Sequence, residues 1–214
     1  MQQKQYGIFS LPVIVGSLGF FVDIYDLLLF SIVRKSSFKE LGVAQDVMKT
    51  VGENIISWQM IGLTVGGIVW GILGDKKGRK QVLFGSILLY SLATIANGFV
   101  KDINTYTALR FIAGLGLAGE LGASITLTSE LLPKEKRGIA AAIIATSGVM
   151  GTIAAYFVYY LSNENWRLCY FIGGGMGIAL LFLRVRVLES TMYDTAKNAQ
   201  AKMGNFFMFF NNRN

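Results

Sequence analysis

The sequence predicts an all-α integral membrane protein, and three observations lead to that prediction. The chain of 214 residues is 53% hydrophobic and 15% charged, against about 25% charged in ordinary soluble domains. Residues 54–74 and 81–100 contain no charged side chain, and each is long enough to cross a bilayer core of about 30 Å as a helix. A short turn rich in lysine and arginine joins them, as expected of a loop on the cytoplasmic side.

Six transmembrane helices are predicted from the uncharged stretches and the charged breaks between them. The predicted spans, in chain order, are 8–33, 54–73, 82–100, 105–128, 138–161 and 168–183. The first is a retained span rather than a signal peptide, because its apolar run is too long and no small-residue cleavage site follows it. A polar loop is predicted at 34–53, and a polar tail is predicted from residue 184 onward.

Two groups of three spans predict a 3+3 inverted repeat. Spans one and four both carry charged residues, which agrees with such a repeat, although no residue-by-residue similarity is visible. The predicted domains are a six-helix transmembrane half at 1–190 and a cytoplasmic tail, or the start of a central loop, at 191–214.

The distribution of basic residues predicts the orientation in the membrane. Lysine and arginine number 13 in the N-terminus, loop 2–3, loop 4–5 and the tail, against 6 in the three opposite loops. Basic residues collect in cytoplasmic loops, so both termini are expected in the cytoplasm of a multi-pass protein of the cell membrane. This bias also explains the net charge of +7. Nucleic-acid binding is not predicted, because that would require the bases to cluster on one soluble face.

The sequence lacks the groups that several other functions require. It has no histidine and a single cysteine, Cys169, which excludes histidine ligation of a metal and an internal disulfide framework. No nucleophile with a matching base is visible, so neither an enzyme nor a cofactor is predicted.

Four ionisable residues lie at membrane depth: Asp23, Asp26, Arg110 and Glu120. A central aspartate or arginine costs about 2.5–3.5 kcal/mol on insertion scales, and such residues usually face each other or a water-filled path for solute or protons. Span four runs inward, so Arg110 is expected about 10 Å outside the midplane, close to the depth of Asp26 at about 7 Å. Asp23 shares a helix face with Asp26.

These depths predict an ion pair between Asp26 and Arg110. In the functional interpretation, Asp26 binds the transported proton and Arg110 tunes it, since a nearby cation favours the ionised carboxylate and desolvation disfavours it. In the alternative, a static ion pair holds the two spans together. Gln59 and Tyr156 are further candidates for contact with a solute in the cavity, although each could equally form a hydrogen bond between helices.

The turn between spans two and three carries a fixed pattern of glycine, acid and base. Its members are Gly71, Asp75, Lys76, Gly78, Arg79 and Lys80. The pattern resembles the signature loop between helices two and three of the major facilitator superfamily. A generic positive loop would explain the bases but not the spacing of the two glycines and the aspartate. The resemblance covers about residues 8–190 and implies one of two six-helix halves, between which a solute binds.

The resemblance extends to the charged residues in the spans. Tyr25-Asp26 and Arg110 look like the aspartate–arginine pair of proton-coupled sugar porters, and the first span is similar to that of metabolite:proton symporters. The implied function is secondary active transport, as proton-coupled symport of a small polar organic solute, either a sugar or a carboxylate. The implied partners are the lipid bilayer, the solute, protons and a second six-helix half. An alternative is a truncated, non-transporting six-helix module that acts as an assembly partner.

The resemblance also implies a charge network at the cytoplasmic ends of the helices, which would close that side of the transporter. The residues of this predicted cytoplasmic gate are Gly71, Asp75, Gly78, Arg79, Lys80, Glu130, Arg137 and Glu189. The alternative is ordinary interfacial charge.

Overall fold

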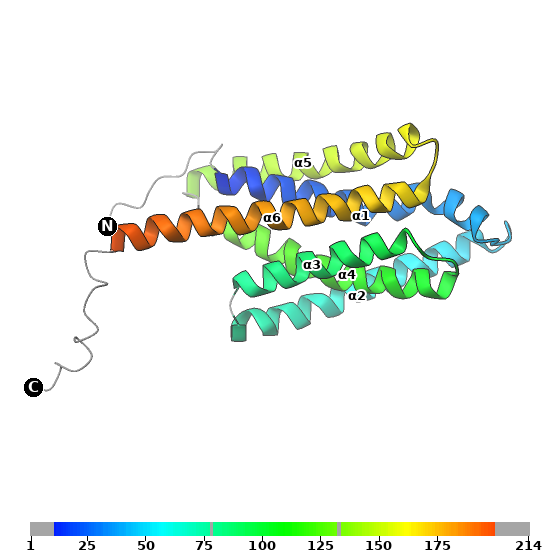
Figure 1. Ribbon diagram of the computed structural model, residues 1–214, viewed down its shortest axis with the longest axis horizontal. Coiled ribbons are helices and arrows are strands. Elements are labelled where there is room, and N and C mark those ends of the chain that lie inside the picture. The colour runs from blue at the N-terminus through cyan, green and yellow to red at the C-terminus, as the bar shows by residue number, and fades with distance from the viewer. Residues whose placement is uncertain (1–10, 78, 132–133, 200–214) are drawn as a thin grey trace, which may run out of the picture. The chain divides into compact units, whose positions relative to one another are not determined.

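The computed structural model of the chain describes residues 11–77, 79–131 and 134–199, with side chains described at 13–76, 81–121 and 138–186. These residues form six α-helices (Figure 1). The helices are α1 Leu11–Glu40, α2 Met48–Lys77, α3 Arg79–Asn97, α4 Ile103–Leu131, α5 Lys134–Leu161 and α6 Trp166–Ala199. The prediction of an all-α fold with six helices is therefore confirmed.

The helices run beyond the predicted spans, and the predicted polar loop at 34–53 is wrong. The connection between α1 and α2 covers only residues 41–47, because polar residues end membrane burial without ending a helix. What ends α1 is Gly42, whose φ of 71° lies in the left-handed region. The Val43 amide donates to the Phe38 carbonyl at 2.9 Å, and the Gly42 amide donates to the Lys39 carbonyl at 3.4 Å. Together they form a Schellman motif, the usual end of a helix at glycine.

The chain divides into two compact units, one ending at Leu181 and the other beginning at Phe182. Span six was predicted to end at residue 183; the part of α6 apolar enough to cross a membrane ends at Arg186, and the helix continues to Ala199. Within the second unit, the described part is this C-terminal portion of α6.

Length and hydropathy identify most of these helices as membrane spans. Among the described residues, α1, α2, α5 and α6 are each long and apolar enough to cross a bilayer. The apolar part of α3 is shorter and covers Gln81–Asn97. The remaining helix, α4, carries Arg110 and Glu120 in its middle, and both side chains are buried inside the first unit.

The helices of the first unit pack in two matching pairs: α1 lies along α5, and α2 lies along α4 (Figure 1). Exchanging α1 with α4 and α2 with α5 converts one pair into the other, which is the packing that a 3+3 inverted repeat produces.

The closest contacts of the two pairs occur at equivalent positions. A Cβ atom added to Gly62 of α2 would lie 2.1 Å from the Phe111 carbonyl oxygen of α4. A Cβ atom added to Gly151 of α5 would lie 2.2 Å from the Phe21 carbonyl oxygen of α1. Small residues let helix backbones approach this closely in membranes, so each pair depends on its glycine.

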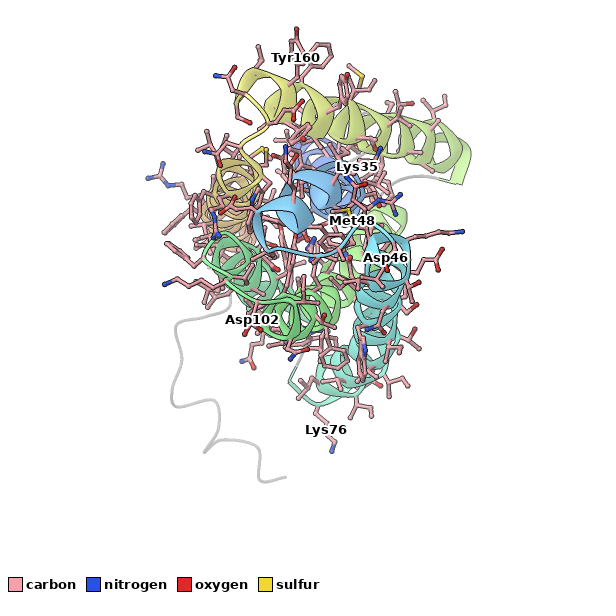
Figure 2. The ribbon with its side chains drawn as sticks, turned by 90° about the vertical axis from the view of Figure 1, so that its right-hand side faces the viewer. Lys35, Asp46, Met48, Lys76, Asp102 and Tyr160 are labelled. Carbon is pink, nitrogen blue, oxygen red and sulfur yellow. The ribbon has the colours of Figure 1, made fainter. Side chains whose placement is uncertain are left out.

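The connections α1–α2, α3–α4 and α5–α6 lie at the same end of the first unit. Figure 2 looks onto this end and shows Asp46, Asp102 and Tyr160 around it; we call it the Asp102 end. One apolar cluster, which includes Tyr25, Phe30 and Trp166, fills the space between the helices near this end. A second cluster, which includes Val22, Ile87, Tyr90, Leu117 and Leu180, lies farther from it.

Candidate functional site

The structure brings Asp26 of α1 and Arg110 of α4 together as an ion pair. Arg110 Nη2 lies 3.0 Å from Asp26 Oδ2, and Arg110 Nη1 donates a longer hydrogen bond of 3.5 Å to the Asp26 carbonyl. The side chains are 0% and 1% exposed. These two charged residues therefore face each other across the crossing of α1 and α4 rather than facing solvent.

Two further helices contribute side chains to this pair. Thr94 of α3 donates a hydrogen bond of 2.8 Å from its hydroxyl to Asp26 Oδ1. Tyr170 of α6 places its ring 5.3 Å from the centre of the Arg110 guanidinium, a distance at which a cation and an aromatic face attract. The Tyr170 and Tyr106 hydroxyls lie 2.5 Å apart and share a hydrogen bond. We call Asp26, Arg110, Thr94 and Tyr170 the Asp26 node.

The hydrogen bonds of the Asp26 node fit an ionised carboxylate, because both Asp26 oxygens act as acceptors. Each Asp26 oxygen accepts one side-chain hydrogen bond, from Thr94 on Oδ1 and from Arg110 on Oδ2. A buried ion pair must be compensated in this way, and removing one partner typically costs about 3–5 kcal/mol because the other charge stays buried. Protonation of Asp26 would remove the negative charge that opposes Arg110.

Two more predicted acids lie on the same pair of helices. Asp23 precedes Asp26 by almost one turn of α1, and Glu120 follows Arg110 by nearly three turns of α4. Both side chains are completely buried. α1 and α4 thus carry three buried carboxylates and one buried guanidinium among the described residues.

The two polar residues predicted to contact a solute lie in different surroundings. Gln59 is 1% exposed, and its backbone carbonyl lies against Gly114 of α4. Its Nε2 and the Nε of Arg110 have no hydrogen-bond acceptor among the described residues. Tyr156 of α5 is 57% exposed and contacts the Phe157 ring. Gln59 therefore lies within this chain, whereas Tyr156 lies on its surface.

Most of the predicted cytoplasmic gate falls outside what the structure describes. Gly71 and Asp75 are exposed near the end of α2. Gly78 lies outside the described residues. The structure does not describe the side chains of the other five gate residues, which are Arg79, Lys80, Glu130, Arg137 and Glu189. No contact between these charges is assigned. Among the described residues, no group of three histidine, cysteine or carboxylate side chains could hold a metal ion.

A second polar cluster, at the Asp102 end, was not predicted from the sequence. Trp166 Nε1 donates to Glu40 Oε2 at 2.6 Å, and Arg167 Nη2 lies 2.9 Å from Glu40 Oε1. Arg167 also donates to the Gly98 carbonyl at 2.8 Å and stacks on the Trp166 ring at 4.3 Å. These contacts fasten the start of α6 to the ends of α1 and α3.

Sequence reasoning also missed Thr94 and Tyr170 in the Asp26 node. A signal for Thr94 was present, because polar residues of α3 recur at helical spacing at Ser86, Tyr90, Thr94 and Asn97. All four are completely buried. A polar stripe on an otherwise apolar span marks the face that packs inside the protein. No comparable signal distinguished Tyr170 from the other aromatic residues of the chain.

The sequence profile of the Major Facilitator Superfamily matches residues 8–213. The chain belongs to this superfamily. A niacin transporter of Acinetobacter baylyi is 36% identical over 141 residues, which cover 65% of this chain and 32% of that protein. A gentisate transporter of Corynebacterium glutamicum is 33% identical over 158 residues, which cover 72% of this chain and 34% of that protein.

The fold agrees with solved structures of the superfamily. The crystal structure of a D-xylose–proton symporter matches with a TM-score of 0.71 at 16% identity, over 92% of this chain and 54% of that one. At this identity the likeness shows the fold alone. The chain spans about a third of the two curated relatives and about half of the solved transporter. It has the fold of the N-terminal six-helix half of a major facilitator transporter.

Proposed function

We propose that this chain is the proton-coupling half of a secondary transporter that moves an organic carboxylate together with protons across the cell membrane. The observation that carries the proposal is the buried Asp26–Arg110 ion pair, at 3.0 Å between α1 and α4. Buried ionisable residues in a membrane protein are costly and usually mark a solute or proton path. The proposed activity is transport and not catalysis.

In this proposal Asp26 binds the transported proton. The ionised carboxylate holds Arg110, and the protonated carboxyl group holds it far less strongly. Because α1 and α4 each carry one member of the pair, protonation weakens the attraction between two helices and shifts the balance between their arrangements. The node is closed to solvent, so the proton reaches Asp26 only in a conformation that opens it. Such gating is what couples a proton to a conformational cycle.

The solute class is supported by the relatives and by the surface of α1 and α5. Niacin and gentisate, named for the two relatives, are both aromatic rings that carry a carboxylate. An apolar groove of about 260 Å³ lies between α1 and α5, with Phe21, Leu18 and Met150 among its lining residues. Such a groove suits a ring better than a sugar. Arg110 does not select the anion here, because Asp26 already neutralises it.

The proposed transporter contains a second six-helix half. Alternating access in this class of transporter requires one half to move against the other. Large apolar side chains are exposed on α2 and α5, among them Trp58, Ile68, Val149 and Phe157, which leaves surface for lipid and for a second half. Protein mass in detergent, after subtraction of the micelle, tests this point. A monomer of 23.5 kDa that carries full uptake activity would contradict it.

The test of the proposed function is the substitution Asp26→Asn in membrane vesicles that contain the protein. Asparagine keeps the size of the side chain but cannot bind the transported proton. Uptake of radiolabelled niacin driven by a proton gradient should fall to the background of empty vesicles. Exchange of internal for external niacin, which needs no net proton movement, should continue. Full gradient-driven uptake by Asp26→Asn would refute the proposal.

The matched control is Asp46→Asn, which makes the same change at an exposed carboxylate in the α1–α2 connection. Its uptake and exchange should equal those of the unmodified protein. If the unmodified protein neither takes up nor exchanges niacin, gentisate or a related aromatic carboxylate, the solute class is wrong. If it also transports no sugar, a non-transporting six-helix module is the better description.

A further inference from the structure

Thr94 is the only uncharged side chain that donates a hydrogen bond to the Asp26 carboxylate among the described residues. Its Oγ1 lies 2.8 Å from Asp26 Oδ1, and the residue is completely buried. The hydroxyl and the Arg110 guanidinium thus occupy different oxygens of the same carboxylate. α3 is therefore linked to the proposed proton-binding group through a single neutral contact.

Gly173 of α6 lies close to Tyr25 and near Thr94. A Cβ atom added to Gly173 would lie 2.8 Å from Tyr25 Cε1 and 3.6 Å from Thr94 Cγ2. A larger residue at this position would press against the Tyr25 ring, whereas its contact with the Thr94 methyl group would be ordinary. Tyr25 is held in turn, because its hydroxyl donates to the Cys169 carbonyl of α6 at 3.1 Å. Tyr25, the neighbour of Asp26 in the sequence, is therefore anchored to α6.

A hydroxyl differs from a guanidinium in what it can do after protonation. Arginine only donates hydrogen bonds, so when the carboxylate is neutralised it loses the charge attraction and cannot accept the new O–H. A threonine hydroxyl both donates and accepts. It can donate to the ionised carboxylate and then accept from the O–H of the protonated acid. Thr94 is thus able to remain bonded to Asp26 in both states, whereas the ion pair with Arg110 exists only in the ionised state.

We propose that Thr94 is a positioning residue for proton coupling: it holds the Asp26 carboxyl group in place in both protonation states and sets the pH at which coupling occurs. This inference rests on the proposed function of Asp26. Hydrogen bonds to a charged acceptor are stronger than those to a neutral one, so the Thr94 hydroxyl favours the ionised carboxylate overall. Its removal should make protonation easier.

The charged and titratable side chains near Asp26 come from four helices. Arg110 of α4 makes the ion pair, and Tyr170 of α6 lies over the guanidinium. Tyr106 of α4 shares a hydrogen bond with Tyr170, and on α1 itself the neighbours are Asp23 and Tyr25.

On α3, Thr94 contacts Asp26, and Tyr90 lies one turn away from Thr94. α5 packs on the Phe20 and Phe21 side of α1 through Gly148 and Gly151. Substitution of Thr94 changes none of these groups.

The test compares Thr94→Val with Thr94→Ser in membrane vesicles. Valine matches threonine in shape without the hydroxyl, and serine keeps the hydroxyl. The pH of half-maximal, proton-driven niacin uptake should rise by about one pH unit in Thr94→Val. Thr94→Ser should return it to the value of the unmodified protein. A merely structural role would lower uptake at every pH without moving the profile.

The matched control is Thr64→Val on α2, where an exposed threonine hydroxyl bonds only to the Met60 carbonyl of its own helix. Its pH profile should not move. If Thr94→Val is poorly produced, Thr94→Ala replaces it, because the smaller side chain also lacks the hydroxyl and cannot clash.

A second measurement does not depend on transport. Infrared spectroscopy of the purified protein detects the C=O stretch of a protonated carboxyl group, and the band lost in Asp26→Asn identifies Asp26. In Thr94→Val this band should appear at a pH about one unit higher than in the unmodified protein. An unchanged titration of the band, or an unchanged uptake profile, overturns the role of Thr94. If Asp26→Asn also keeps full coupling, the proposed function fails as well; if it loses coupling, only this inference fails.

Discussion

Individual polar contacts hold this chain together where apolar burial gives no preference between a helix and lipid. Asp26 is matched by Arg110 and Thr94 inside the first unit. Asp102 has a different task at the surface. It precedes α4 and accepts hydrogen bonds of 2.8 Å from the Thr105 backbone amide and from the Thr105 hydroxyl. The residue caps the N-terminus of α4, which has amides without helical partners.

The cap predicts a pH-dependent stability. The Thr105 amide, followed by the Thr105 hydroxyl, holds the pKa of Asp102 below its ordinary value. A lowered pKa in the folded state means that the stabilisation is present above about pH 4 and is lost as the pH falls through the lower folded value. Asp102→Ala should therefore unfold at a lower temperature than the unmodified protein at pH 6, and the difference should be smaller at pH 3.

Thermal unfolding in detergent at both pH values measures this effect. Asp102→Asn is the control, because the amide oxygen still accepts a hydrogen bond but does not titrate. A difference between Asp102→Ala and the unmodified protein that stays constant from pH 6 to pH 3 would show that the charge of the cap contributes nothing.

For individual residues, the sequence predicted the contact that charge determines. Asp26 and Arg110 could be paired in advance, since few charges lie at membrane depth and these two share a depth. The polar stripe of α3 marked the buried face that carries Thr94 but not its partner, and Tyr170 had no signal at all, because hydroxyls and aromatic rings are common in membrane helices and carry no cost that demands a partner. Their role depends on the rotation of α3 and α6, which the residues around them determine.

At the scale of the helix, glycine determines which neighbours can meet. Gly62 and Gly66 of α2 lie against the backbone of α4 at Phe111 and Leu115. Gly67 lies next to them in sequence, and a Cβ added there meets nothing within 4 Å. α2 thus contains glycines that lie against α4 and a glycine that does not.

This difference predicts opposite effects of one substitution. Gly62→Ala should destabilise the protein by about 1–3 kcal/mol, because the new methyl group would overlap the Phe111 carbonyl oxygen and two backbones would have to separate. Gly67→Ala should leave the unfolding temperature unchanged or raise it slightly, since alanine is a better helix former by about 0.5–1 kcal/mol. Thermal unfolding in detergent compares them, and equal unfolding temperatures for the two variants would contradict the assigned contact.

The existence of the helices followed from hydropathy, but their ends did not. The loop predicted at 34–53 proved to be mostly helix because lysine, arginine and glutamate are good helix formers. α1 stops at Gly42, whose backbone adopts a left-handed conformation. Hydropathy reports where the membrane ends, whereas a helix ends where its backbone is capped.

The whole first unit is organised by the inverted repeat, which the sequence suggested through the number of spans and the charges on spans one and four. In the structure, Phe21 and Phe111 occupy equivalent places against Gly151 and Gly62. Counting from them, Arg110 corresponds to Phe20 of the first repeat. The two repeats therefore share backbone packing but not charge: α1 supplies the acid and α4 the base. This divergence hid the repeat from sequence comparison.

The proposed orientation of the unit is testable as a whole. The excess of lysine and arginine predicts that the end of α2 that carries Asp75 lies in the cytoplasm and that the Asp102 end lies outside. Asp46→Cys should react with a membrane-impermeant maleimide added to intact cells, whereas Asp75→Cys should react only after permeabilisation. The native Cys169 is buried and should remain unlabelled. The reverse labelling pattern would invert the topology.

The central claim is that solute and proton move together through a half whose coupling group is Asp26. The most direct measurement is the pH inside membrane vesicles after niacin is added outside, without any imposed proton gradient. The unmodified protein should acidify the interior as niacin enters, and Asp26→Asn should not, although it still exchanges niacin. Acidification of equal size in both proteins would contradict the account, because the proton would then travel by another group.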